Sequence, residues 1–277
     1  MALALVVTAA CTGYPGETRG LLNEPMLHPG DAFTARTLRQ GELIYNQSPQ
    51  TLPLPSWAWW GVTDWLTAEI DLLPLLGGFF IEPHLPVPSF NFRFRLRDGG
   101  GEGLSLAYET MLQYNWEPFA QVDGPHLHIL REGLSWFHRI NLTQPLSESV
   151  ALHLSAGFTY AESIAIENMD REVYHGRAFS DLLTPDVSVA IDWRVAGWLS
   201  LHASTSIGTT FVYLDNVPRK AQVMGAFRVA PFYRSRYAFL RTFRIESSAF
   251  AMYLPDADEW FVLPLPVIPY FYWQWRI

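Results

Sequence analysis

The chain has 277 residues, of which 49% are hydrophobic, 15% aromatic and 17% charged, and its formal net charge is −8 at pH 7. This acidic balance, without a concentrated basic face, argues against a nucleic-acid partner. After the amino-terminal stretch no apolar run reaches the roughly eighteen residues of a membrane-spanning helix, which excludes a helical membrane protein. A single cysteine excludes an internal disulfide and a cysteine-based metal site, and we expect no cofactor.

The amino terminus has the pattern of an export signal. Residues 1–10 are apolar and end in small residues directly before Cys11. The stretch resembles the end of a bacterial lipoprotein signal peptide with a lipobox from Thr8 to Cys11, and this resemblance implies that Cys11 is lipidated. An ordinary signal peptide cleaved after Ala10 is the alternative, and it implies export as well.

Two regions follow this stretch. Residues 11–35 begin with a segment rich in Gly, Pro and polar residues, which predicts a flexible leader without secondary structure. Residues 36–277 repeatedly alternate apolar and polar residues, which predicts one β domain.

Alternation with a period of two defines the expected strands. It is sharpest in residues 90–97, where Phe and Leu alternate with Asn and Arg in a pattern that no helix could separate into two faces. Strands are expected, in chain order, over Glu42–Gln47, Leu66–Leu73, Phe90–Arg97, Gly103–Trp116, Leu134–Thr143, Val150–Tyr160, Val187–Val195, Trp198–Leu214, Gln222–Tyr233, Phe239–Tyr253 and a segment ending at Ile277.

These segments number about eleven, whereas single-chain bacterial barrels have even strand numbers, so we expect twelve strands, with ten as the alternative. The additional strand is expected between Phe119 and Leu130 or before Trp59. Residues 51–60 depart from the alternation, with two prolines and a Trp pair, and are expected to form a loop at the interface or in the barrel mouth.

Short turn signals separate several of the strands. They occur at Asp98–Gly101, Ser147–Ser149 and Ala196–Gly197, as tight hairpins require. Longer connections are expected over Glu162–Pro185 and Asp215–Ala221, on the opposite side of the sheet.

The carboxyl end supplies a resemblance to a known class. Residues 269–277, PYFYWQWRI, resemble the last strand of outer-membrane β-barrel proteins, and residues 61–67 resemble a turn-and-strand phrase of porin-like outer-membrane proteins. The resemblance implies an all-β, closed, antiparallel up-and-down transmembrane barrel in the outer membrane of a Gram-negative bacterium, in contact with its lipid. A soluble β-sandwich or lipocalin-like barrel is the alternative, because its strands also alternate.

The polar parity of the strands assigns charged residues of both signs to the lumen. These candidate lumen residues are Glu69, Asp71, Arg93, Arg95, Glu109, Arg139, Asp192, Arg194, Arg228, Arg244 and Glu246. Such an interior could line a narrow pore, which favours a porin or transporter for small polar solutes. It could also form an ion-paired plug, which favours a structural or assembly component with protein partners in the cell envelope.

An enzyme is not expected. A lipid hydrolase of the outer membrane would need a histidine beside a nucleophile at the membrane edge. The chain has eight histidines, and none lies in the His-x-Ser-Asn-Gly phrase of the outer-membrane phospholipase. His126 and His128 would share one face of an extended segment, but two ligands do not make a metal site, so no metal is expected.

Overall fold

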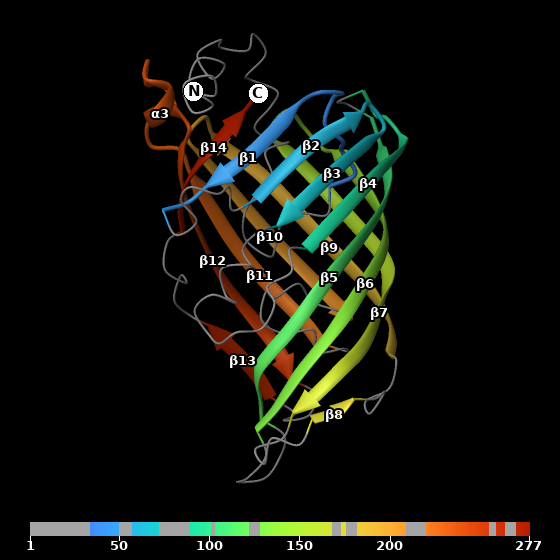
Figure 1. Ribbon diagram of the computed structural model, residues 1–277. Helices are drawn as coiled ribbons and strands as arrows, with labels where there is room; N and C mark the ends of the chain where they lie inside the picture. Colours follow the sequence, from blue (N-terminus) through green and yellow to red (C-terminus); the bar gives the residue numbers. More distant parts are fainter. Residues whose placement is uncertain are drawn as a thin grey trace, which may run out of the picture.

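Twelve of the strands in the described residues close into an antiparallel barrel (Figure 1). The computed structural model describes residues 34–49, 57–71, 89–100, 103–121, 128–167, 173–175, 182–208, 220–254, 259–263 and 270–277. The barrel strands are β1 (Leu43–Gln47), β2 (Trp57–Thr63), β3 (Leu66–Asp71), β4 (Ser89–Arg97), β5 (Ser105–Gln121), β6 (His128–Pro145), β7 (Val150–Glu167), β9 (Leu182–Ala196), β10 (Leu199–Gly208), β11 (Lys220–Val229), β12 (Phe243–Leu254) and β14 (Tyr270–Arg276). The expectation of a closed antiparallel barrel of twelve strands is confirmed.

The barrel closes because each strand pairs with its neighbour in the chain and the last pairs with the first. Tyr45 of β1 lies opposite Trp275 of β14, and the other edge of β14 pairs with β12. Two short strands extend hairpins beyond the circuit: β8 (Val173–His175) pairs with β7, and β13 (Glu259–Leu263) pairs with β12. Within the described residues, no helix is long and apolar enough to cross a membrane.

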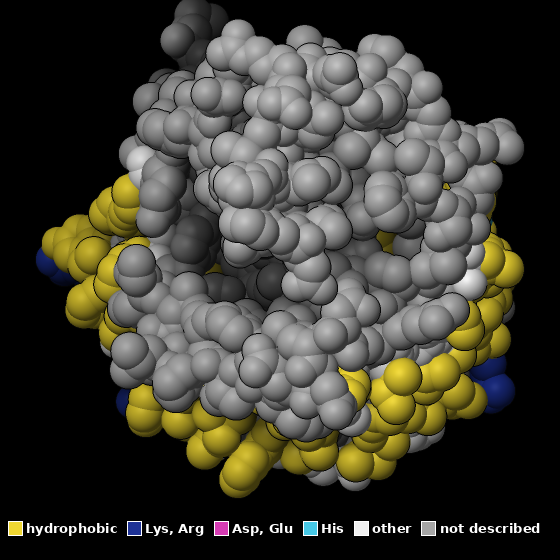
Figure 2. All heavy atoms as spheres, turned by 90° about the horizontal axis from the view of Figure 1, so that it is seen from below, with side chains coloured by type: hydrophobic (Ala, Val, Ile, Leu, Met, Phe, Trp, Pro, Cys, Tyr) yellow, Lys and Arg dark blue, Asp and Glu magenta, His cyan; other side chains and the backbone are white. Residues whose placement is uncertain are grey.

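The two faces of the wall have opposite chemistry, because successive side chains of a strand point to opposite faces. On β6, Asn141 and Thr143 are fully buried inside, whereas Trp136 is half exposed on the outside. Figure 2 shows hydrophobic side chains around the described part of the periphery. Large apolar residues are therefore exposed and polar residues buried, the reverse of a soluble barrel.

Short connections gather at one end of the barrel. Residues 64–65, 98–104, 146–149 and 197–198 join consecutive strands there, and Gly100, with a φ of 62°, makes the left-handed bend of its turn. The same end carries the short helix α3 (Ala238–Arg241) between β11 and β12, and the end of β14 (Figure 1).

Three of the expected boundaries were wrong. The additional strand is β2, which begins before Trp59 as one of the two expectations had it, but it overlaps the end of the segment expected to be a loop and continues to Thr63. Its parity was hidden because Trp57 and Trp59 point inward, so both of its faces are aromatic. The expected strand Phe239–Tyr253 begins as helix α3 and becomes β12 only at Phe243.

The third correction concerns the expected loop Glu162–Pro185. Strand β7 continues through its start to Glu167, because Ala165 and Ile166 still pair with β6, and β9 begins at Leu182. The expected connection Asp215–Ala221 lies largely outside the described residues, except that β11 begins at Lys220.

Candidate functional site

The inner wall carries a row of alternating charges that the strand register aligns. Arg93 of β4 lies opposite Glu109 of β5, and Glu109 lies opposite Arg139 of β6. Arg93 Nη2 and Glu109 Oε1 are 3.1 Å apart, and Arg139 Nε and Asp186 Oδ1 are 2.8 Å apart. All four side chains are buried, so each charge is stabilised by a partner along the wall.

A glycine allows the second of these pairs to form across an intervening strand. Arg139 lies on β6 and Asp186 on β9, and between them Gly157 of β7 lies opposite both residues. A Cβ at Gly157 would lie 2.8 Å from Cγ of Arg139 and 1.9 Å from the carbonyl oxygen of His138. The arginine side chain therefore needs the space that glycine leaves.

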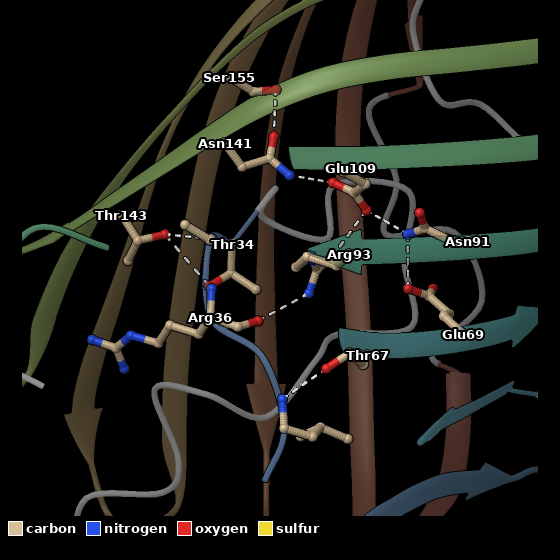
Figure 3. Close-up of polar contacts among 12 residues, drawn as sticks. Thr34, Arg36, Thr67, Glu69, Asn91, Arg93, Glu109, Asn141, Thr143 and Ser155 are labelled. Atoms are coloured by element: carbon tan, nitrogen blue, oxygen red, sulfur yellow. Dashed lines mark hydrogen bonds and ion pairs between the residues drawn. The ribbon is translucent and has the colours of Figure 1, made fainter. Parts of the chain in front are cut away.

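Amides connect the charged row to a further carboxylate, that of Glu69 (Figure 3). Glu109 accepts hydrogen bonds from the side-chain amides of Asn91 and Asn141, and the Asn141 oxygen accepts one from Ser155 at 2.8 Å. Asn91 also donates to Glu69 at 3.0 Å. These bonds fix the carboxylates against the wall, since a buried carboxylate needs donors for its oxygens.

A smaller ionic group lies on the last strands. Arg228 Nε of β11 is 3.3 Å from Glu246 Oε2 of β12, and the Tyr272 hydroxyl of β14 donates to the same carboxylate. Arg244 of β12 is also buried, and its guanidinium donates a hydrogen bond to the backbone oxygen of Arg241 at 2.7 Å.

Two histidines hold another carboxylate, that of Asp192, on the wall. Asp192 Oδ2 is 3.1 Å from His153 Nε2, and Asp192 Oδ1 is 2.5 Å from His202 Nδ1. His153 Nδ1 lies 2.9 Å from Thr143 Oγ1, which gives a hydroxyl, an imidazole and a carboxylate in sequence. The Thr143 hydroxyl, however, is buried, and its oxygen accepts a hydrogen bond from the backbone N–H of Ala35 at 2.8 Å. These three side chains therefore hold backbone in place, and the hydroxyl is not arranged as a free nucleophile.

The segment before β1 lies inside the barrel, bound to these wall residues (Figure 3). Besides the Ala35 contact, the backbone N–H of Leu38 donates to Thr67 Oγ1 at 2.8 Å. Arg93 Nη1 donates to the Arg36 carbonyl at 3.4 Å. We call residues 34–38 the luminal segment. It occupies part of the lumen near the end with the short turns.

The structure gathers most of the candidate lumen residues on the inner wall but treats three differently. Arg95 lies near the rim and bonds Asp98 at 2.9 Å, Arg194 is half-buried, and the side chain of Asp71 lies outside the described part of the chain. The buried members are Glu69, Arg93, Glu109, Arg139, Arg228, Arg244 and Glu246, and Asp192 is held by its two histidines.

Sequence reasoning missed Asp186 and the luminal segment. Asp186 has the same parity as Ser188 and Asp192, so extending the expected strand Val187–Val195 by one residue at its start would have found it. The luminal segment shows no alternation, and its contacts include backbone donors to distant threonines, for which no local signal exists. Cys11 lies outside the described residues.

His138 of β6 lies on the outside of the barrel. His138 Nδ1 is 2.6 Å from the Tyr108 hydroxyl, and the imidazole ring packs on Trp136 and Phe158. In the described parts of the chain, no group of three or more His, Cys, Asp and Glu side chains is placed to hold a metal ion. His126 lies outside those parts.

The chain matches no protein-family model and no curated protein sequence. Among solved structures it is similar to a doubly substituted OccD1 (OprD), with 10% identity, a TM-score of 0.29, and coverage of 76% of this chain and 54% of that one. It is also similar to OccD3 (OpdP) of Pseudomonas aeruginosa, with 9% identity, a TM-score of 0.27, and coverage of 96% and 98%. The chain thus spans about half the length of the first structure.

Proposed function

We propose that the protein is an outer-membrane β-barrel that lets small polar solutes pass through a narrow, ion-paired lumen. The observation that carries this proposal is the inversion of the wall, with large apolar side chains exposed outside and charged side chains buried inside. The apolar outer face suits contact with lipid, and the charged inner face suits contact with water or a polar solute. A soluble barrel with this wall would expose its apolar face to water at great cost.

The charges of the wall favour weak ion selectivity. Arg93 and Arg139 alternate with Glu109 and Asp186, so neither sign dominates this row. The pairs also join residues on nearby strands, so they lie along the wall. Both features support small polar solutes of either sign over a single charged substrate.

The runner-up is a structural or assembly component of the envelope with a closed lumen. The luminal segment favours it, because Ala35 and Leu38 are fixed to Thr143 and Thr67 and fill part of the cross-section. Enzymatic activity is not proposed, since the imidazole and hydroxyl groups described above are used in structural contacts.

Planar bilayers separate the two functions. The purified full chain is first heated in detergent before electrophoresis, because a folded transmembrane barrel changes its apparent mass when it unfolds. The folded protein is then added to a bilayer, where the channel proposal predicts discrete conductance steps with a reversal potential near zero in a salt gradient. A silent bilayer at high load of protein that passed the heating assay would overturn the channel and favour the closed lumen.

A further inference from the structure

The connection between β11 and β12 is unlike the other short connections. Residues 230–242 contain four aromatic residues and three arginines, and they contain no acidic residue and no lysine. The whole chain has a net charge of −8, so this is a local concentration of positive charge in an acidic protein. We call these residues the aromatic–arginine connection.

Helix α3 places the connection against the outer wall and not over the lumen. The Phe239 ring stacks on Trp273 of β14 with centroids 4.9 Å apart. Trp273 lies on the outward parity of its strand, next in sequence to the buried Tyr272. Phe232 also lies against the outer wall, and its ring centroid is 6.2 Å from that of the outward-facing Phe243.

Other apolar surface of the connection is left uncovered. Phe239 is 56% exposed, Tyr237 55% and Phe232 46%, and Leu240 is also exposed. In a water-facing turn such a cluster would be unfavourable, whereas at a membrane interface aromatic rings of this kind are stabilised between acyl chains and headgroups.

The arginines of the connection lie among these rings. The Arg236 guanidinium lies 4.7 Å from the centre of the Tyr237 ring, and that of Arg234 lies 5.2 Å from the centre of the Tyr233 ring. Among the residues that the structure describes, neither guanidinium has a carboxylate partner, unlike Arg93 or Arg139 of the wall. Guanidinium groups pair well with phosphate oxygens, to which they donate in a bidentate manner.

From this juxtaposition we infer that the aromatic–arginine connection is a binding surface for anionic phospholipid, with its rings in the acyl boundary and its arginines on headgroup phosphates. The inference rests on the proposed membrane location. The connection lies at the end with short turns, which in outer-membrane barrels faces the periplasm, so the lipid is that of the periplasmic leaflet. Anionic lipid is favoured over zwitterionic lipid because the connection supplies only positive charge.

The test places a reporter inside the connection. In the full chain, Cys11→Ser and Ser235→Cys are introduced, and the new thiol is labelled with bimane. The protein is reconstituted into phosphatidylcholine vesicles that contain nitroxide-labelled phosphatidylglycerol or nitroxide-labelled phosphatidylcholine at equal mole fraction. Bimane quenching then gives the relative association of the two lipids with this site.

We expect phosphatidylglycerol to associate about fivefold more strongly than phosphatidylcholine, and about 0.5 M NaCl to remove most of this preference by screening. The double variant Arg234→Gln/Arg236→Gln should bring the ratio to about one. The matched control Arg39→Gln/Arg97→Gln removes two exposed arginines at the same end of the barrel and should keep the preference.

Three outcomes would overturn the inference. Equal quenching by both lipids would show that the contact has no charge preference. If the control variant lost the phosphatidylglycerol preference as fully as Arg234→Gln/Arg236→Gln, the preference would come from the overall positive charge at this end of the barrel. Quenching by neither lipid would place the connection in water or against a protein partner. Flotation of the vesicles checks membrane insertion independently, and a silent planar bilayer would overturn the channel proposal without affecting this result.

Discussion

Substitution of Gly157 tests whether the charged row depends on the space that this glycine leaves. In Gly157→Ala the new Cβ would lie 1.9 Å from the His138 carbonyl oxygen and 2.8 Å from both Cα and Cγ of Arg139. Two of these three atoms are backbone, so the clash cannot be relieved by a rotamer change alone. Strands β6 and β7 must separate there, and this movement should also disturb the pair of Arg139 with Asp186.

The size of the effect follows from the pair that is lost. Arg139 and Asp186 are each about 4% exposed, and disrupting a buried pair of this kind costs about 3–5 kcal/mol. We expect Gly157→Ala to lower the free energy of unfolding by that amount. Gly225→Ala is the matched control, because Gly225 also lies in a strand, has no positive φ and has nothing within 4 Å of the position that an added Cβ would take. Its effect should stay within about 1 kcal/mol.

Urea unfolding in vesicles, followed by tryptophan fluorescence, measures both variants. A double-mutant cycle with Arg139→Gln isolates the proposed cause. If Gly157 acts by admitting the arginine, the two losses are less than additive by about 1 kcal/mol or more. Equal unfolding midpoints for Gly157→Ala and Gly225→Ala would refute the steric reasoning. Additive losses would assign the cost to the backbone clash alone.

Three further outcomes are expected. The double variant Thr67→Val/Thr143→Val removes two acceptors of the luminal segment and should raise single-channel conductance; unchanged conductance would show that the segment does not limit flow. Glu109→Gln leaves its arginine neighbours in excess and should shift the reversal potential toward anions, and a shift toward cations would contradict this. Tyr108→Phe removes a hydrogen bond to His138 on the outer face and should lower the free energy of unfolding by about 1 kcal/mol in the same urea assay. A loss above about 3 kcal/mol would show that Tyr108 contributes more than one hydrogen bond.

The sequence was sufficient for the barrel where each strand had one apolar and one polar face. Strand β4 is the clearest example, because four apolar side chains alternate with polar ones and the structure exposes Phe92 and buries Arg93. It was insufficient for β2, where Trp57 and Trp59 are buried inside and Trp60 is exposed outside. An aromatic residue fits either face of this wall, so alternation of residue type disappears while alternation of direction remains.

Residue contacts inside the barrel were less predictable than strand positions. Parity places Arg139 on the polar face of its strand, but it does not reveal that the partner lies two strands away at Asp186, because this depends on the register of three strands and on Gly157. The luminal segment was predicted only as the boundary between leader and barrel. Its position depends on two threonines distant in sequence, and burial of backbone donors leaves no trace in local composition.

The wall and the luminal segment have separable roles in the choice between pore and plug. The pairs Arg93–Glu109 and Arg228–Glu246 join adjacent strands, and Asp192 lies between two histidines on its two neighbouring strands, so these interactions brace the wall without crossing the lumen. The luminal segment alone, among the described residues, is a backbone held inside the wall. In the proposed channel, the bonds that hold this segment should therefore affect the passage of solutes more than the ion pairs of the wall do. Breaking those bonds, as in Thr67→Val/Thr143→Val, should change flow and cost the barrel little beyond the Thr143–His153 hydrogen bond, about 1 kcal/mol, whereas breaking the ion pairs should weaken the barrel first.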